Sequence, residues 1–236
     1  MSKYLRFGLV AFSLALLMSV ISVPEAKAQI LTEILKRMDI NNKSLQSVRS
    51  DITMVKYESA LKISDTYAGS TSYLPKTAKR VMYARIDWKT ENGKPNESSL
   101  AVIGDEYQLY KPKLNQVITG NVSKSKNNES VGGSLGFMNM SKDQLKANYT
   151  VVYIGEEQLS GGALAWHLEL TPKAAANYKS ADIWVDGDGM PRQSRINEKN
   201  NDSTTIQLSS IQKNVTIKGE VFTLNYDKKK VKIIKS

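Results

Sequence analysis

His167 is the only histidine in the 236-residue chain, and the chain contains no cysteine. A chain with one histidine and no thiol cannot build a histidine-rich or cysteine-ligated metal site, and it has no thiol nucleophile. A serine hydrolase would still be possible, but the sequence lacks the G-x-S-x-G motif that presents the serine in many of these enzymes. We therefore predict no catalytic role for His167.

The acidic residues give no stronger sign of catalysis. Asp186-Gly187-Asp188-Gly189 begins like a calcium loop, but Met190-Pro191-Arg192 follows where further ligands would be needed, so the segment is read as a turn between two strands. The pairs Asp105-Glu106 and Glu156-Glu157 are adjacent in sequence, and adjacent residues of a strand face opposite ways. The chain is predicted to be no enzyme, with no catalytic residue, metal or cofactor.

Most of the chain alternates between apolar and polar residues with the period of a strand. Leu164, Trp166 and Leu168 share one face of such a segment, whereas His167 points to the other face. Glycine- and asparagine-rich turns separate the segments, which indicates an antiparallel meander and a strongly curved sheet. The predicted strands are 50–58, 81–90, 99–103, 107–111, 116–119, 151–157, 163–171, 182–186, 192–198, 204–211 and 215–224.

Four stretches depart from this rhythm. Residues 30–38 place apolar side chains on one stripe of a short helix that is predicted to end near Asn41. Residues 62–79 are predicted to form a long loop or an irregular hairpin. Residues 124–140 contain several glycines and methionines and are read as a mobile apolar lid, followed by a helical turn that Ser141 caps.

The first 28 residues have the order of a secretory signal: basic residues, an apolar run from Phe7 to Val23, and the small-residue site Ala26-Lys27-Ala28. Cleavage after Ala28 would leave one domain, residues 29–236. The whole chain carries +10, and the signal holds three basic groups and one acidic group, so 10 − (3 − 1) = +8 remains. Export argues against nucleic acid as the anionic partner, and Lys228-Lys229-Lys230 is read as a solvated tail or edge strand.

Several short segments, in order, resemble one known family. They are Ile86-Asp87-Trp88, Gly104 to Pro112, Trp166 to Lys173 with its Leu-Thr-Pro-Lys end, Ile183 to Asp186, Gly189 to Gln193, and Asn201 to Thr205. Together they make residues 30–236 similar to the LolA family of outer-membrane lipoprotein carriers.

The resemblance implies a mainly β fold with a few helices, in which a strongly curved antiparallel sheet forms an incomplete β barrel. A helical and loop lid would cover an apolar cavity that receives lipoprotein acyl chains. Met38 would take the place of a lid leucine, and Arg80, with Arg85 as the alternative, would take the place of a gating arginine that precedes the aromatic strand. The full set of expected cavity and lid residues is Met38, Met54, Arg80, Ile86, Trp88, Leu100, Val102, Leu109, Phe137, Met138, Met140, Trp166 and Leu168.

The same resemblance implies a monomeric periplasmic carrier that takes lipoproteins from the inner to the outer membrane. Its partners would be acylated lipoproteins, an inner-membrane ABC-type releasing complex, and an outer-membrane receptor or the outer membrane itself. The alternative is a periplasmic regulatory domain of the same fold that senses a lipid or lipoprotein without transporting it. A hydrolase of the cell envelope is disfavoured because no nucleophile and base are assembled.

Overall fold

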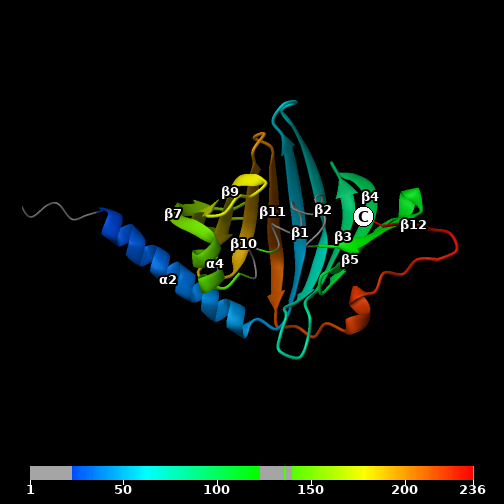
Figure 1. Cartoon of the computed structure of the whole chain (residues 1–236), viewed down its shortest axis with the longest axis horizontal. Coiled ribbons are helices and arrows are strands. Elements are labelled where there is room, and N and C mark those ends of the chain that lie inside the picture. Colours follow the sequence, from blue (N-terminus) through cyan, green and yellow to red (C-terminus); the bar gives the residue numbers. More distant parts are fainter. Residues whose placement is uncertain (1–22, 123–135, 137–139, 236) are drawn as a thin grey trace, which may run out of the picture.

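One strongly bent sheet organises the part of the chain that the computed structural model describes, namely residues 23–122, 136 and 140–235 (Figure 1). Strands β1 to β6, with β12 at their edge, form one half of it, and β7 to β11 form the other. The strands are β1 (Val48–Glu58), β2 (Ile63–Leu74), β3 (Tyr83–Glu91), β4 (Lys94–Ile103), β5 (Glu106–Lys111), β6 (Gln116–Asn121), β7 (Tyr149–Gln158), β8 (Leu164–Pro172), β9 (Tyr178–Val185), β10 (Pro191–Glu198), β11 (Ser203–Lys213) and β12 (Lys232–Lys235).

Strand β1 joins the two halves, because it pairs with β2 on one side and with β11 on the other. The spatial order is β12-β6-β5-β4-β3-β2-β1-β11-β10-β9-β8-β7, and all pairs are antiparallel except β12 with β6. Among the strands described, β7 and β12 each have a single neighbour, so the sheet bends without closing. The mainly β, incomplete-barrel prediction is confirmed.

The bend gives the sheet a concave and a convex face. Along β1, Val48, Ile52 and Met54 are buried on the concave face, while Arg49 and Asp51 on the convex face are exposed. This alternation is the period-two pattern of a strand with two different environments. The predicted meander therefore places its apolar residues on the inside of the curve.

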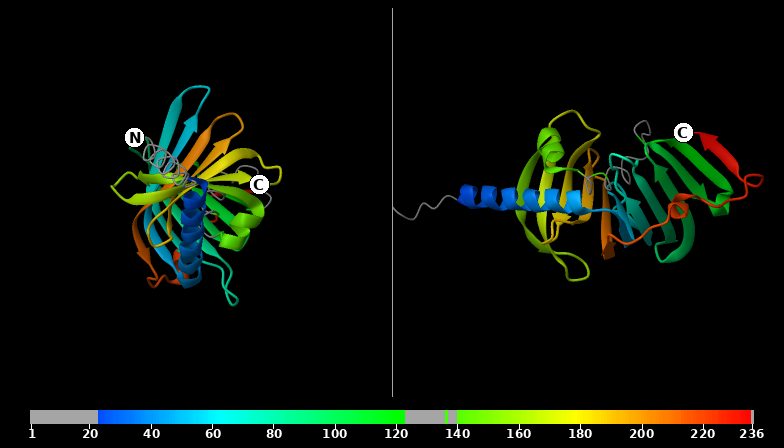
Figure 2. Two further views of the ribbon diagram at one scale, coloured as in Figure 1. Left: turned by 90° about the vertical axis from the view of Figure 1, so that its left-hand side faces the viewer. Right: turned by 90° about the horizontal axis from the view of Figure 1, so that it is seen from below.

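Helix α2 (Val23–Ser44) lies across the concave side of the β7–β11 half, and the β3–β6 half extends beyond it (Figures 1 and 2). Most of the predicted stripe is confirmed, because Ile34, Leu35 and Met38 are buried against the sheet and Leu31 packs beside them, whereas Ile30 is exposed. The helix starts before the predicted residue 30 and includes Ala28, whose role as a cleavage site stays a prediction. Neither helix in the described ranges combines the length and apolarity needed to cross a bilayer.

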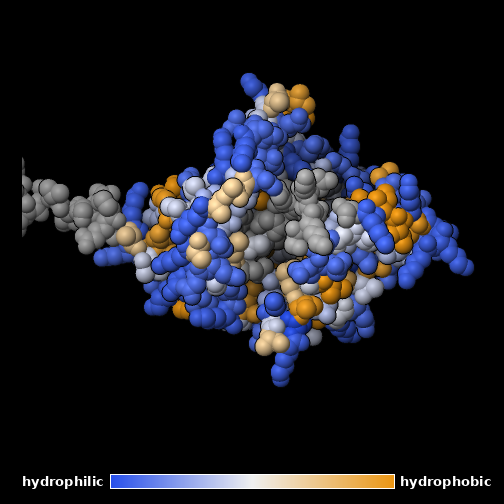
Figure 3. All heavy atoms as spheres, in the orientation of Figure 1, coloured by the Kyte–Doolittle hydropathy of each residue, from blue (hydrophilic) through white to orange (hydrophobic). Residues whose placement is uncertain are grey.

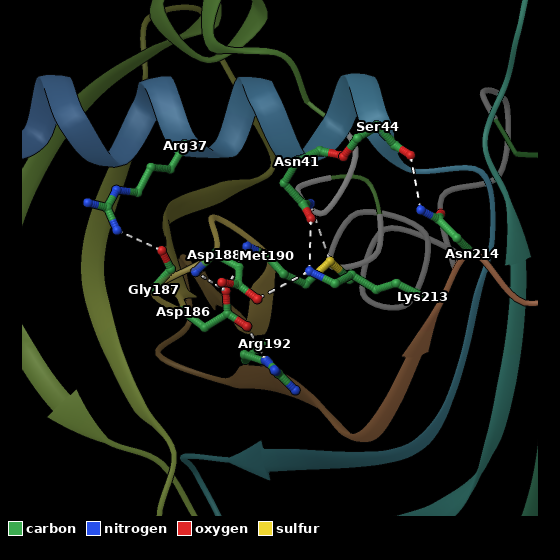
Figure 4. A network of polar contacts seen from close by, with 10 residues as sticks. All are labelled: Arg37, Asn41, Ser44, Asp186, Gly187, Asp188, Met190, Arg192, Lys213 and Asn214. Atoms are coloured by element: carbon green, nitrogen blue, oxygen red, sulfur yellow. Dashed lines mark hydrogen bonds and ion pairs between the residues drawn. The ribbon is translucent and has the colours of Figure 1, made fainter.

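Polar contacts hold α2 on the turn between β9 and β10 (Figure 4). Arg37 donates a hydrogen bond to the Gly187 carbonyl at 2.9 Å, and Asn41 contacts Met190 Sδ at 3.5 Å. Gly189 has φ +83°, and a Cβ at this position would lie 2.3 Å from the Arg37 carbonyl. The helix and turn backbones therefore touch at a point that only glycine fits.

The short helix α4 (Lys142–Asn148) also packs on this half of the sheet, through buried Leu145. Ser141 is its N-cap, as predicted. The Ser141 hydroxyl accepts from the Gln144 amide, and the Gln144 side chain accepts from the Ser141 amide, which together make a capping box.

Two predicted segments differ from the structure. Residues 62–79 were expected to form a loop or irregular hairpin, but most of them form β2, because residues 63–73 pair with β1 and residues 67–74 pair with β3. Residues 215–224 were expected to form a strand, but they contain the 3₁₀ helix η4 (Gly219–Phe222). Arg85 donates to the Val221 and Thr223 carbonyls on the convex face, so this segment is bound by a side chain rather than by a strand neighbour.

Candidate functional site

An apolar stripe crosses the concave face of the β3–β6 half. Ile86, Leu100, Leu109 and Ile118 lie opposite one another on four adjacent strands. Neighbouring strands are about 4.8 Å apart, so the stripe is about 14 Å long. Trp88 and Met54 continue it toward β1. Five of the expected cavity residues thus share one surface: Met54, Ile86, Trp88, Leu100 and Leu109.

A cavity of about 480 Å³ opens at the end of this stripe where β1, β3 and β5 approach their following turns. This volume lies within the range of roughly 300–1,000 Å³ typical of small-ligand sites. Its apolar part contains Met54, Trp88, Leu100 and Leu109, which were all predicted. The remaining lining residues are Lys56, Tyr67, Glu91, Asn96, Glu97, Ser98, Lys111, Lys113 and Leu114.

Tyr67 also lines the cavity. It was not predicted from the sequence, because it lies in the segment that was expected to be a loop. Its ring meets Trp88 edge-on at 6.0 Å, and its hydroxyl donates to Glu91 Oε1 at 2.7 Å. Burial, and then the hydrogen bond to Glu91, raise the pKa of Tyr67 to about 12. Tyr67 therefore keeps its proton and joins the apolar floor to a polar rim.

The cavity has basic groups at its mouth. Lys56 Nζ lies 5.6 Å from the centroid of the Tyr67 ring, a cation–π distance. Lys113 donates to the Pro95 carbonyl at 2.7 Å, and Lys111 lies beside it. Glu91 and Glu97 lie on the same rim. An apolar floor below a charged rim is an arrangement that fits an amphiphile.

Four other expected residues lie in a second apolar cluster, beneath α2 and α4. Met38 and Leu168 are buried in it, and Met140 and Trp166 pack at its edge. Arg37 covers the Trp166 ring at 5.3 Å. The structure thus divides the expected site between two clusters, one under the helices and one at the open cavity. Val102 lies in a third, smaller cluster with Ala84 and Tyr107.

The two candidate gating arginines occupy different places. Arg80 donates to the carbonyls of Gln46 and Pro75, at the junction of α2 with the sheet. Arg85 lies on the convex face, where it is paired with Asp87 at 2.8 Å. Arg80 is therefore the one beside the helix that covers the concave face. Phe137 and Met138 lie outside the described residues, as does the predicted lid segment 124–140 except for residues 136 and 140.

His167 lies on the convex face, as its alternation in the sequence predicted. Its Nδ1 is 2.7 Å from Glu157 Oε1, its Nε2 is 2.8 Å from Asp182 Oδ1, and it stacks on Trp184 at 4.3 Å. Burial lowers the pKa of His167, but the hydrogen bonds to Asp182 and Glu157 outweigh it and raise the pKa. Because carboxylates occupy both ring nitrogens, neither is available to accept a proton from a nucleophile.

The pKa values of the two carboxylates that contact His167 are lowered, whereas that of His167 is raised. The hydrogen bond from Trp184, and then that from His167, hold the pKa of Glu157 below its ordinary range. Burial raises the pKa of Asp182, but hydrogen bonds from His167 and Asn197 and the charge of Arg195 lower it overall. The cluster links β7, β8, β9 and β10 through charge-assisted hydrogen bonds.

The Asp186-Gly-Asp-Gly segment forms the predicted turn. Asp186 Oδ1 accepts from the amides of Asp188 and Met190, and Asp186 Oδ2 accepts from Arg192 at 2.6 Å. Its carboxylate is therefore satisfied by the protein itself. Within the described ranges, no group of three or more acidic or histidine side chains is arranged to hold a metal ion.

Several solved structures are similar to this chain at low sequence identity. An uncharacterised conserved protein from Thermus thermophilus matches with a TM-score of 0.53 at 12% identity, over 87% of this chain and 99% of that chain. The lipoprotein LppX from Mycobacterium tuberculosis matches with a TM-score of 0.45 at 16% identity, over 79% and 98% of the two chains. A putative outer membrane lipoprotein-sorting protein domain from Vibrio parahaemolyticus gives 0.43 at 14%, over 80% and 94%.

No curated protein matches the sequence. The family model of the outer membrane lipoprotein carrier protein LolA, however, matches residues 84–225, which run from β3 to the segment after η4 and include most of the stripe. That range covers more than half of the chain. The chain therefore belongs to the LolA family.

Proposed function

We propose that this protein is a carrier that binds lipoprotein acyl chains on its concave face. The observation that carries the proposal is the open cavity whose floor is Met54, Trp88, Leu100 and Leu109. A methylene group removed from water gains about 0.8 kcal/mol, so an acyl chain needs such a surface to cross an aqueous space. The stripe across β3 to β6 offers a path along which a chain can lie.

The carrier also has to release its cargo. The apolar site is divided between the open cavity and a separate cluster under α2. An acyl chain could therefore leave one part while the other is still closed. We propose that α2 and α4 are the lid, with Met38, Met140, Trp166 and Leu168 beneath it, and that Arg80 holds the lid at its hinge with the sheet. Movement of the lid would join the two clusters into one larger apolar surface.

The wider route follows from the family. We propose that the protein is exported to the periplasm, receives acylated lipoproteins from an inner-membrane ABC-type complex, and delivers them to the outer membrane or a receptor there. It would act as a monomer, without catalysis and without a cofactor. Ile86, Val102, Phe137 and Met138 complete the residues that we propose to contact the acyl chains.

A fluorescent fatty-acyl probe tests the binding step. Leu109→Asp places a charge on the cavity floor and should weaken probe binding at least tenfold, since burying an unpaired carboxylate costs several kcal/mol. Leu164→Asp is the matched control, because Leu164 is exposed at the start of β8. Equal affinities for the two variants would contradict the proposal. Transfer of bound probe to acceptor vesicles separates a carrier from a sensor, which would retain it.

A further inference from the structure

One corner of the molecule holds most of its net charge. We call it the η2–β12 corner, and it comprises residues 110–116, with the 3₁₀ helix η2 (Pro112–Leu114), and residues 226–235, with β12. These two segments contain seven lysines and one acidic residue, Asp227, so their net charge is 7 − 1 = +6. The whole chain carries +10. The seven lysines are Lys111, Lys113, Lys228, Lys229, Lys230, Lys232 and Lys235.

The fold brings these two segments together from positions more than a hundred residues apart. Strand β12 adds to β6 in parallel, with Lys232 opposite Gln116, and the Lys232 amide donates to the Asn115 carbonyl at 2.7 Å. Lys111 lies opposite the same Gln116 on the next strand. Lys111 and Lys232 are therefore only two strand spacings apart, or about 10 Å.

Within the corner, Asp227 is the only acidic residue, and Glu91 and Glu97 line the same cavity as Lys111 and Lys113. Asp227 lies 3.7 Å from Lys230, and in the described part of the chain none of the other six lysines forms an ion pair. Lys228, Lys229 and Lys230 are exposed in the turn before β12. The corner thus presents a concentrated positive field to the solvent, of the kind that attracts anionic surfaces.

Apolar side chains are exposed among these lysines. Leu114 in η2 is 58% exposed, and Ile233 in β12 is 53% exposed. In Figure 3, apolar atoms in orange lie among polar atoms in blue at the end of the molecule where Figure 1 places β12. Lysines around exposed leucine and isoleucine are the composition of surfaces that bind at the interface of an anionic membrane.

The corner is continuous with the cavity. Lys111, Lys113 and Leu114 belong to the corner and also line the cavity mouth. A membrane lying against the corner would therefore face the entrance to the apolar floor. An acidic protein partner would account for the lysines, but it would not account for exposed apolar groups beside an acyl-sized opening.

We propose that the η2–β12 corner docks the protein on an anionic phospholipid bilayer, with Leu114 and Ile233 entering the interfacial layer. This contact would bring the cavity mouth to the membrane surface, where acyl chains enter and leave. Docking is a property separate from acyl binding, because five of the seven lysines that would contact the membrane do not line the cavity. Docking and acyl binding are therefore separable by substitution.

Vesicle cosedimentation tests the proposal, with the full chain and vesicles of phosphatidylcholine alone or with about one quarter phosphatidylglycerol. The wild type should bind only the anionic vesicles, and less tightly as salt is raised. Each lysine near an anionic surface accounts for about a fivefold change in affinity, so K228Q/K229Q/K230Q should bind roughly 100-fold more weakly. The matched control, K36Q/K146Q/K199Q, removes the same charge from other exposed sites and should keep most of the binding.

Two further measurements distinguish membrane insertion from a purely electrostatic contact, and docking from acyl binding. L114S/I233S leaves all seven lysines in place and should still weaken vesicle binding. A purely electrostatic contact would leave the affinity of this variant unchanged. The K228Q/K229Q/K230Q variant should bind the acyl probe as the wild type does, so a failure of docking is distinguishable from a failure of acyl binding. Equal loss in the two triple variants, or equal binding to neutral and anionic vesicles, would overturn the proposal.

Discussion

Replacing Gly189 by alanine should separate α2 from the turn on which it rests. The new Cβ would lie 2.3 Å from the carbonyl carbon and oxygen of Arg37 and 2.6 Å from the Met38 amide nitrogen. These atoms are backbone, so the helix or the turn has to move by about 1 Å to restore van der Waals contact. Such a shift disturbs the packing of Ile34 and Leu35 on the sheet.

The cost has two parts. A non-glycine residue in the left-handed region costs about 1–2 kcal/mol. Forcing extra volume into a packed contact costs about 1–3 kcal/mol. The sum is about 2–5 kcal/mol, and at about 3 kcal/mol a domain of this size loses roughly 6–12 °C in Tm.

Two other glycine substitutions separate the backbone cost from the packing cost. Gly187→Ala lies in the same turn, but its Cβ would meet nothing within 4 Å, so its Tm should match that of the wild type. Gly161 has φ +93° and also has open space around its Cβ position, so Gly161→Ala reports the backbone cost alone. In differential scanning calorimetry, Gly187→Ala should have the highest Tm, Gly161→Ala a lower one and Gly189→Ala the lowest. A Gly189→Ala variant as stable as Gly187→Ala would refute the close contact between α2 and the turn.

Three further perturbations test the rest of the framework. Because the pKa of His167 is raised in the folded protein, the stability that His167 contributes is complete below about pH 6.5 and is lost as the pH rises through the folded-state pKa. His167→Gln should therefore remove this loss of Tm with rising pH from thermal melts. An unchanged slope of Tm against pH in the variant would contradict the role of His167. Leu168→Ala empties a fully buried site and should cost about 2–5 kcal/mol in urea unfolding, whereas a cost below about 1 kcal/mol would be too small for that burial. Ser141→Ala removes the cap of α4 and should cost about 1 kcal/mol, with faster hydrogen exchange at the amide it caps.

The sequence predicted the sheet because its signals are local. Alternation in 164–171 assigns both faces of β8, and the turn residues after Val185 predict the β9–β10 hairpin. The cap at Ser141 is equally local, since all its partners lie within four residues. Membership of the LolA family was also predictable, because the matching segments keep their order along the chain.

The features that were missed depend on distant partners. Strand β2 is rich in serine and threonine, and it forms because β1 and β3 pair with its two edges. The segment 215–224 alternates like a strand, yet Phe222 is buried against Tyr83 on the convex face, with ring centroids 5.3 Å apart. No short-range pattern in the sequence carries either contact.

The division of the expected site could not be predicted either. Met54 and Leu168 have the same strand pattern in the sequence, but one lines the open cavity and the other is buried under α2. The difference arises from where the helix crosses the sheet. Tyr67 was missed because it lies in β2, a segment that was expected to be a loop, and Lys111 was missed because its place in the cavity depends on the distant strands β1 and β3.

Photo-crosslinking with a diazirine-labelled fatty acid, followed by peptide mapping, tests the central claim most directly. The label should attach to residues of β3, β4 and β5 that line the cavity, above all Trp88, Leu100 and Leu109. Excess unlabelled fatty acid should compete for the same positions. Labelling confined to the convex face, around His167 or Arg85, would contradict the account.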